Sequence, residues 1–273
     1  MAESSRTLAQ FSRIENDGWR LGFRNLLAKE NRKWWKGNRW FIQVAIWTGL
    51  LDGLLILLLF VIPSMTTPNG QPVMPGDTLQ SGVQGLFNLA PIALAMGIII
   101  LVQDAVIREK QSGTAEWVLS KPASRYAFIL AKVTANTIAV LVTMIAIPFL
   151  IAYVILYMFQ GNAYPIYPIL SGCGLVLLHT FFYMCLTVLV GVLVNNRSLV
   201  LAISLGTLLG GSFLSSIFPP ISLITPWMLP DITSLIAIGE TIPPLFWIPI
   251  ISTAIWSIIF VGVALWRFQH HEF

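Results

Sequence analysis

Six long apolar stretches limit what this chain can fold into more than any other feature. A helix needs about 20 apolar residues to cross a hydrocarbon core of about 30 Å. We expect the spans at Trp40–Ile62, Gly85–Val102, Ala127–Met158, Ile169–Val194, Ser198–Phe218 and Phe246–Trp266. Hydrophobic residues make up 56% of the chain and charged residues only 10%, against about 25% in soluble domains, so the sequence predicts an all-α membrane protein with six transmembrane helices. The third stretch is longer than a bilayer requires, which predicts an interfacial turn at one of its ends.

The basic residues predict how the chain is oriented. All 16 Lys and Arg lie before or at the start of the first span, between Arg108 and Lys132, at Arg197 or at Arg267, which places them on one side of a six-span chain. By the positive-inside rule that side is the cytoplasm, so we expect a multi-pass protein of the cell membrane with both termini cytoplasmic. The net charge of +4 then reflects topology and contact with anionic membrane lipids, and it requires no nucleic-acid partner.

Ahead of the first span we expect a flexible leader at residues 1–20 and an amphipathic helix at residues 21–39. One helical face carries apolar side chains and another carries basic ones, namely Phe23, Leu26, Leu27 and Trp34 against Lys29, Arg32, Lys33 and Lys36. A helix of this kind lies in the membrane surface. The first 39 residues are polar and basic, which is unlike a cleavable signal peptide.

Glu30 is an exception within that helix, because it falls between Leu27 and Trp34 on the apolar face. One interpretation is a surface carboxylate that pairs with Lys33, which is worth a few tenths of a kcal/mol. The other is a fixed contact with a basic residue of the polar segment Gln103–Phe128, which would tie the surface helix to that segment.

The polar segment Gln103–Phe128 interrupts the apolar stretches with a dense group of charges. Ser112 or Thr114 can cap a helix, so a short helix is expected at Thr114–Leu119. Pro122 ends it and Ser124 opens the third span. A force on this cross-piece would act on the second and third spans together.

The last external region, Pro219–Pro244, is apolar but broken by six prolines. Half-length apolar segments with such breaks cannot span a bilayer, and they are typical of re-entrant or interfacial helices. These would cap a pathway from outside. The alternative is a loop that rests on lipid and has no gating role.

Asp52 lies near the middle of the first span, where an ionisable group costs about 2.5 to 3.5 kcal/mol on insertion scales. The flanking Gly49 and Gly53 suggest close helix packing, which favours a structural partner or a protonated state over a substrate pathway. Asn88, Asn136 and His179 are likewise expected to bridge helices.

The run R-E-K-Q-S-G-T-A-E-W-V-L-S-K-P-A-S-R at residues 108–125 resembles the signature of ABC type-2 permeases, the membrane subunits of ATP-binding-cassette exporters. Together with the topology, the resemblance covers about residues 21–268. It implies a type V exporter fold, with a connecting helix at Leu21–Gly37, a coupling helix at Gly113–Leu119 within residues 105–122, a transmembrane domain at residues 40–268 and a cytoplasmic tail at 269–273.

The same resemblance assigns residues to the two coupling elements. Contact with an ATPase subunit is implied for Asp104, Arg108, Glu109, Gly113, Thr114 and Glu116, and a place on the connecting helix for Glu30, Arg32 and Lys33.

No G-x-x-x-x-G-K-[ST] motif occurs in the chain, so the phosphates of ATP have no P-loop here. We therefore expect a transport subunit that is not an enzyme and holds no cofactor or metal of its own, while ATP and magnesium bind a separate ATPase. The expected assembly has two ATPase copies and two permeases, identical or paralogous.

The cargo is expected to be hydrophobic or amphipathic, because the residues proposed to line the pathway, Phe87, Asn88, Met96, Leu208 and Phe213, carry no fixed charge. Two alternatives are weaker. An intramembrane enzyme would need convergent catalytic or metal-binding groups, yet Asp52 and His179 stand alone and no E-E-x-x-x-R or H-x-x-x-H pattern occurs. A secondary transporter or channel would favour inverted repeats or a filter-like glycine motif, and neither is visible.

Overall fold

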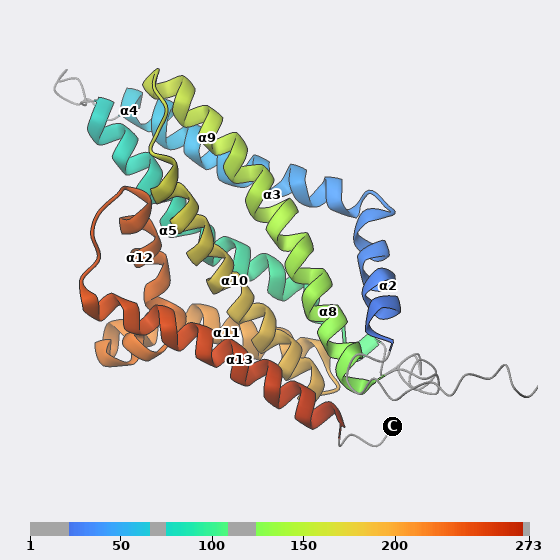
Figure 1. Ribbon diagram of the computed structural model, residues 1–273. Coiled ribbons are helices and arrows are strands. Elements are labelled where there is room, and N and C mark those ends of the chain that lie inside the picture. The colour runs from blue at the N-terminus through green and yellow to red at the C-terminus, as the bar shows by residue number, and fades with distance from the viewer. Residues whose placement is uncertain (1–21, 66–74, 109–123, 270–273) are drawn as a thin grey trace, which may run out of the picture.

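The computed structural model describes residues 22–65, 75–108 and 124–269, and this part of the chain is helical without strands. Its elements are α2 (Phe23–Trp35), α3 (Arg39–Ile56), η2 (Leu57–Val61), α4 (Ile62–Met65), α5 (Pro75–Val102), α8 (Arg125–Val140), η3 (Leu141–Ala146), α9 (Ile147–Gln160), α10 (Ile166–Leu193), α11 (Arg197–Ile217), η4 (Pro219–Ile224), η5 (Pro226–Met228), α12 (Leu229–Ala237), η6 (Pro244–Phe246) and α13 (Trp247–Gln269). The all-helical fold class is therefore confirmed (Figure 1).

Six helices are long and apolar enough to cross a membrane, as predicted. They run over Arg39–Ser64, Gly76–Val102, Arg125–Gln160, Ile166–Leu193, Arg197–Ser215 and Pro244–Gln269. Two details differ from the prediction. The second span begins nine residues earlier than Gly85, since Pro75 and Asp77 suit the first turn of α5 and Val83 is buried. The extra length of the third span is taken up in a continuous helix with a π-helical stretch at Leu141–Ala146, so the predicted interfacial turn is wrong.

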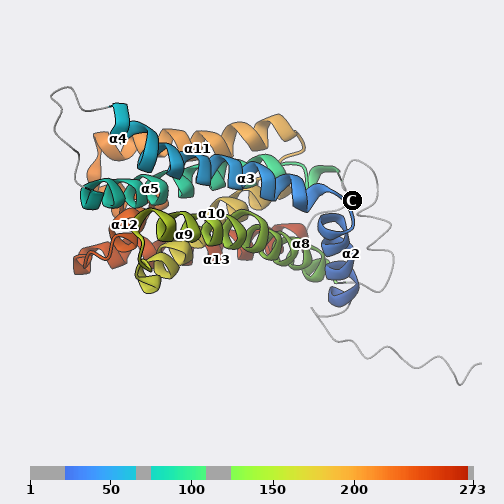
Figure 2. The same ribbon diagram turned by 90° about the horizontal axis from the view of Figure 1, so that it is seen from above.

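The ends of the six helices alternate between the two ends of the bundle. The starts of α3, α8 and α11 and the ends of α5, α10 and α13 gather at the end where α2 lies (Figures 1 and 2). Arg125 Nη1 in α8 donates to the main-chain oxygen of Gln269 in α13 at 2.7 Å, which joins two of these helix termini. Ser124 caps α8 by accepting from the Tyr126 N–H at 3.2 Å, so the predicted start of the third span is confirmed.

α10 forms the centre of the bundle, and it packs against α5, α11, α12 and α13. Its buried share, 72% of the apolar window, is the largest of the six spans in the described residues, against 22% for α13 and 28% for the first span. The His179 Nδ1–H in α10 donates to the carbonyl oxygen of Pro91 in α5 at 3.0 Å. α10 is therefore the helix around which the others are placed, while the outer helices keep broad apolar faces for lipid.

The proline-broken region forms short helices that fold back against the bundle. Leu229, Ile232 and Ala237 of α12 are buried, and the helix packs on α5 and α10. Asn88 Nδ2 of α5 donates to Asp231 Oδ1 at 2.8 Å. Packing inside the protein argues against a loop that merely rests on lipid, and the re-entrant placement in a membrane stays a prediction.

The polar residues of the spans fall into two groups. Asn88, Asn136 and His179 each bond to another helix, as predicted. Asp52 forms no such bond, because both its carboxylate oxygens lack a hydrogen-bond partner among the described residues. Its side chain is nevertheless buried, with only 4% of its surface exposed. Within the described part of the chain, Gly49 and Gly53 do not show the close helix packing predicted for them, because a Cβ at either position would meet nothing within 4 Å.

Candidate functional site

α2 is attached to the bundle along α8 (Figure 2). The helix begins after Gly22, whose φ of 79° lies in the left-handed region that glycine adopts readily. Leu26 and Trp34 are buried, whereas Arg32 is exposed, so the apolar face predicted for this helix points to the protein. Within the predicted range of residues 21–39, the regular helix covers Phe23–Trp35.

A buried ion pair joins α2 to α8. Glu30 Oε1 lies 3.1 Å from Lys132 Nζ, and the Lys132 side chain is only 2% exposed. Glu30 also pairs with Lys33 at 3.0 Å within α2. Glu30 therefore makes both the local pair with Lys33 and a long-range contact with a basic residue. The predicted location of the long-range partner is wrong, because Lys132 lies four residues beyond the segment Gln103–Phe128.

Sequence reasoning did not place Lys132 in the candidate site, although a signal existed. It is a charged residue inside an otherwise apolar stretch, and such a residue requires a partner. Its ammonium also lies 4.9 Å from the centre of the Phe128 ring, a cation–π contact within α8.

Trp34 makes a second connection between the two helices. Its Nε1–H donates to Asn136 Oδ1 in α8 at 2.9 Å, one helical turn beyond Lys132. Glu30 and Trp34 are four residues apart on α2, as Lys132 and Asn136 are on α8. The two helices therefore meet through matched pairs on facing turns.

Arg39 is the first residue of α3, and it packs on Trp34. Its guanidinium carbon lies 4.3 Å from the centre of the Trp34 ring. The connection from α2 to α3 is the short link Lys36–Asn38, so the start of α3 is fixed to the same cluster. The residues that position α2 also position the entry of the chain into the first span.

Two of the six predicted coupling residues are described, and both lie where α5 ends. Arg108 Nε lies 2.6 Å from Asp104 Oδ2, and the Arg108 side chain is 75% exposed while that of Asp104 is 22% exposed. Glu109, Gly113, Thr114 and Glu116, together with the short helix predicted at Thr114–Leu119, lie outside the described residues. The described chain stops at Arg108 and resumes at Ser124, next to the start of α8.

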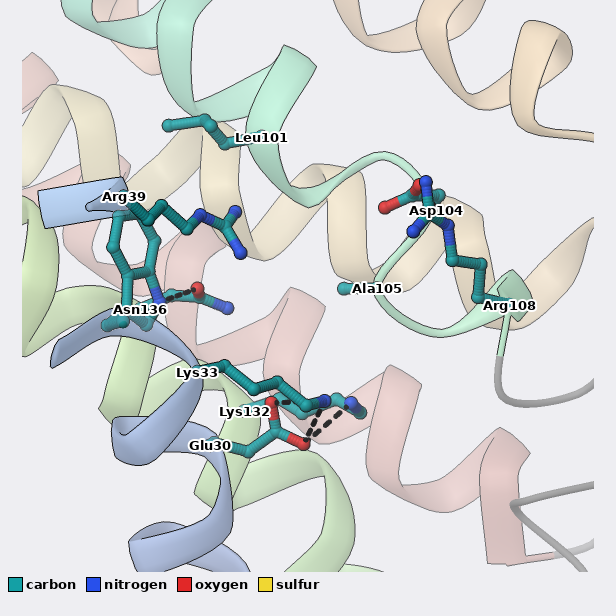
Figure 3. A pocket seen from close by; sticks show the side chains of 10 residues that line it. Glu30, Lys33, Arg39, Leu101, Asp104, Ala105, Arg108, Lys132 and Asn136 are labelled. Atoms are coloured by element: carbon teal, nitrogen blue, oxygen red, sulfur yellow. Dashed lines mark hydrogen bonds and ion pairs between the residues drawn. The ribbon is translucent and has the colours of Figure 1, made fainter. Parts of the chain in front are cut away.

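These elements surround a pocket of about 230 Å³ (Figure 3). It is lined by Glu30, Lys33, Trp34, Arg39, Leu101, Asp104, Ala105, Arg108, Lys132 and Asn136. A second groove adjoins it, lined by Ile107 and by the turn Asn195–Arg197 between α10 and α11, and it shares Asp104 and Arg108 with the pocket. Glu30, Lys33, Asp104 and Arg108, which were predicted as connecting-helix or coupling residues, thus come together at one end of the bundle. Arg32 does not line this pocket, and it lies instead in a shallow groove along α2.

The residues predicted to line a pathway are placed differently from one another. Phe87 and Leu208 are buried in the core of the single chain, where Phe87 lies 4.9 Å from the ring of Phe149. Met96 and Phe213 are exposed, and Asn88 is half-buried beside α12. Only the last three present surface to a space beside the helices, so in this conformation the pathway residues do not form one continuous lining.

The fold and the charged end of the bundle define a polytopic helical membrane protein whose only dense ionic cluster among the described residues lies at one end. A family model described as "ABC-2 family transporter protein" matches residues 55–273. The chain therefore belongs to the ABC-2 transporter family, and it is a transmembrane permease domain. The comparison with curated proteins found no match.

Proposed function

We propose that this chain is the permease of an exporter driven by a separate ATP-binding-cassette ATPase. The observation that carries the proposal is the attachment of α2 to α8 through Glu30–Lys132 and Trp34–Asn136. The segment that holds the signature joins the end of α5 to the start of α8. A displacement of that segment would move both helices, and through Lys132 it would also move α2.

The proposed mechanism is a shift between two conformations. Nucleotide binding closes the ATPase pair, and the ATPase then favours the permease conformation that it contacts best. Because Arg39 packs on Trp34, a movement of α2 also acts on the start of α3. The signature segment adjoins α5 and α8, and α2 adjoins α3, so the force would reach three of the six spans at one end of the bundle.

The cargo that we propose is hydrophobic or amphipathic. A groove of about 520 Å³ beside α5 is lined by Leu54, Leu58, Ser81, Gln84, Gly85, Asn88 and Leu89. None of these side chains is charged. Such a lining suits a lipid-like molecule with one or two polar groups better than a small ion, whose hydration shell it could not replace.

The partner ATPase is tested by purification. We expect the tagged chain, isolated in mild detergent from membranes that contain its partner, to carry a Walker-motif subunit with vanadate-sensitive ATP hydrolysis. Glu116→Lys should reduce the amount of that subunit, whereas Glu240→Lys, a matched charge reversal on the proposed external side, should not. Equal recovery of the ATPase with both variants, or none with the unaltered chain, would count against the proposal.

A further inference from the structure

The pocket at the junction of α2, α3, α5 and α8 carries an excess of positive charge. Its lining includes Lys33, Arg39, Arg108 and Lys132 on the basic side, against Glu30 and Asp104 on the acidic side. Glu30 is shared between the two lysines, and Asp104 bonds to Arg108. The carboxylates of the pocket are therefore already engaged, and the four cationic side chains of its lining outnumber them by two.

Arg39 lies near both carboxylates of the pocket but is paired directly with neither of them. It is half-buried, and in the part of the chain that the structure describes it forms no ion pair within 4 Å. Trp34 covers one face of its guanidinium at 4.3 Å. The stacking covers only one face of the guanidinium, and Figure 3 shows its edge turned toward the pocket that Asn136, Ala105 and Lys132 line.

A half-buried guanidinium in this setting requires an acceptor. Removing a charge from water without a partner is costly, and an arginine that stacks on an aromatic ring is suited to bind a phosphate in its plane through two parallel hydrogen bonds. Lys132 adds a second cation at the base of the pocket, and it is almost fully buried. The arrangement is complementary to a compact, strongly negative group with several oxygens.

The side chains beside the pocket indicate what kind of molecule would carry this negatively charged group. Trp35 and Trp40 flank Arg39 along the chain and are each 37% exposed, as expected for aromatic residues at the boundary between headgroups and acyl chains. From Arg39, the stripe at spacings of three and four along α3 carries Ile42 and Ile46, which are 51% and 50% exposed. A charged head in the pocket would therefore continue into apolar chains along α3.

We propose that this pocket binds the phosphate group of an anionic phospholipid, with Arg39 as its main ligand. The headgroup would occupy the space between α2, α5 and α8, and the acyl chains would follow the exposed face of α3. A bound phosphate would join α2 and α3 to the end of α5 without an additional protein contact. The proposal concerns a ligand of the permease alone, so it holds or fails independently of the ATPase.

The test is a binding titration of the delipidated chain in detergent, read by native mass spectrometry with phosphatidylglycerol and with phosphatidylcholine. We expect one tightly held phosphatidylglycerol, and Arg39→Gln should weaken it about tenfold or more, since hydrogen bonds to a charged group are the strong ones. Arg267→Gln is the matched control, because Arg267 is an exposed arginine at the same end of the bundle, on α13 and outside the pocket. Arg39→Lys keeps the charge and loses the planar fork, so it should give an intermediate loss.

The remaining arms separate the possible sources of the phosphate. Competition by millimolar inorganic phosphate against phosphatidylglycerol would support a phosphate site that a lipid fills. Saturation by inorganic phosphate with no retention of phosphatidylglycerol would overturn the assignment to a lipid. Equal binding by the unaltered chain and Arg39→Gln, with both eluting as single species, would overturn the site itself, as would an equal loss with Arg267→Gln.

Discussion

Lys132 Nζ lies 3.1 Å from Glu30 Oε1, which places a nearly fully buried ammonium of the third span against the helix that precedes the first. The two residues are 102 positions apart in the chain. Since α8 directly follows the signature segment and α2 directly precedes α3, this pair links two elements on which the proposed ATPase would otherwise act separately.

Glu30→Gln should destabilise the protein by about 3 kcal/mol, because it removes the carboxylate that lies 3.1 Å from the buried ammonium of Lys132. Thermal unfolding in detergent measures the change. Lys33→Gln is the matched control, and it should cost less than about 1 kcal/mol, because the Lys33 side chain is 43% exposed. Equal effects of the two variants would show that the link between helices contributes little.

Trp34→Phe should cost about 2 kcal/mol, since it removes the hydrogen bond to Asn136 and weakens the contact with the Arg39 guanidinium while keeping most of the apolar surface. Trp35→Phe makes the same change at an exposed neighbour and should lie within about 0.5 kcal/mol of the unaltered chain. The comparison uses the midpoint of thermal unfolding. A larger effect at Trp35 would contradict the described orientation of α2.

Gly172→Ala should destabilise the contact between α10, α5 and α12 by about 2 kcal/mol, because a Cβ there would lie 2.6 Å from Phe87 Cε1 and 3.3 Å from Ala237 Cβ. Gly174→Ala, two residues further along the same helix, meets nothing within 4 Å and should be neutral or stabilising. Unfolding of both variants, measured side by side, tests whether α5 and α12 pack closely against α10 at Gly172. Identical midpoints would contradict this packing.

Asp52→Asn should leave ATP-driven transport intact and raise the stability by about 1 kcal/mol, because an amide costs less to bury than a carboxyl group whose oxygens meet no hydrogen-bond partner among the described residues. Unfolding and transport are measured on the same preparation. A folded variant that has lost transport would instead favour an ion-coupled secondary transporter, in which this carboxylate takes part in the cycle.

The spans and the charged end of the bundle could be predicted because each depends on a property of one stretch, either about 20 apolar residues or the side on which basic residues fall. The pairing of Glu30 with Lys132 could not, because nothing local to either residue specifies a contact across 102 positions. The start of α5 was missed, since its first residues are too polar to be recognised as membrane helix. The position of α12 could not be predicted either, because it depends on tertiary packing such as that of Ala237 near Gly172. For Asn88, Asn136 and His179, the sequence could predict that each side chain bonds to another helix. It could not predict which residue each one bonds to.

The most direct test of the account is cargo uptake into inside-out proteoliposomes that contain the permease with its partner ATPase. We predict uptake of a lipophilic peptide that requires ATP, stops with vanadate and is lost with Glu116→Lys while Glu240→Lys retains it. Uptake that proceeds without the ATPase, or that an ion gradient drives in the absence of ATP, would contradict the account.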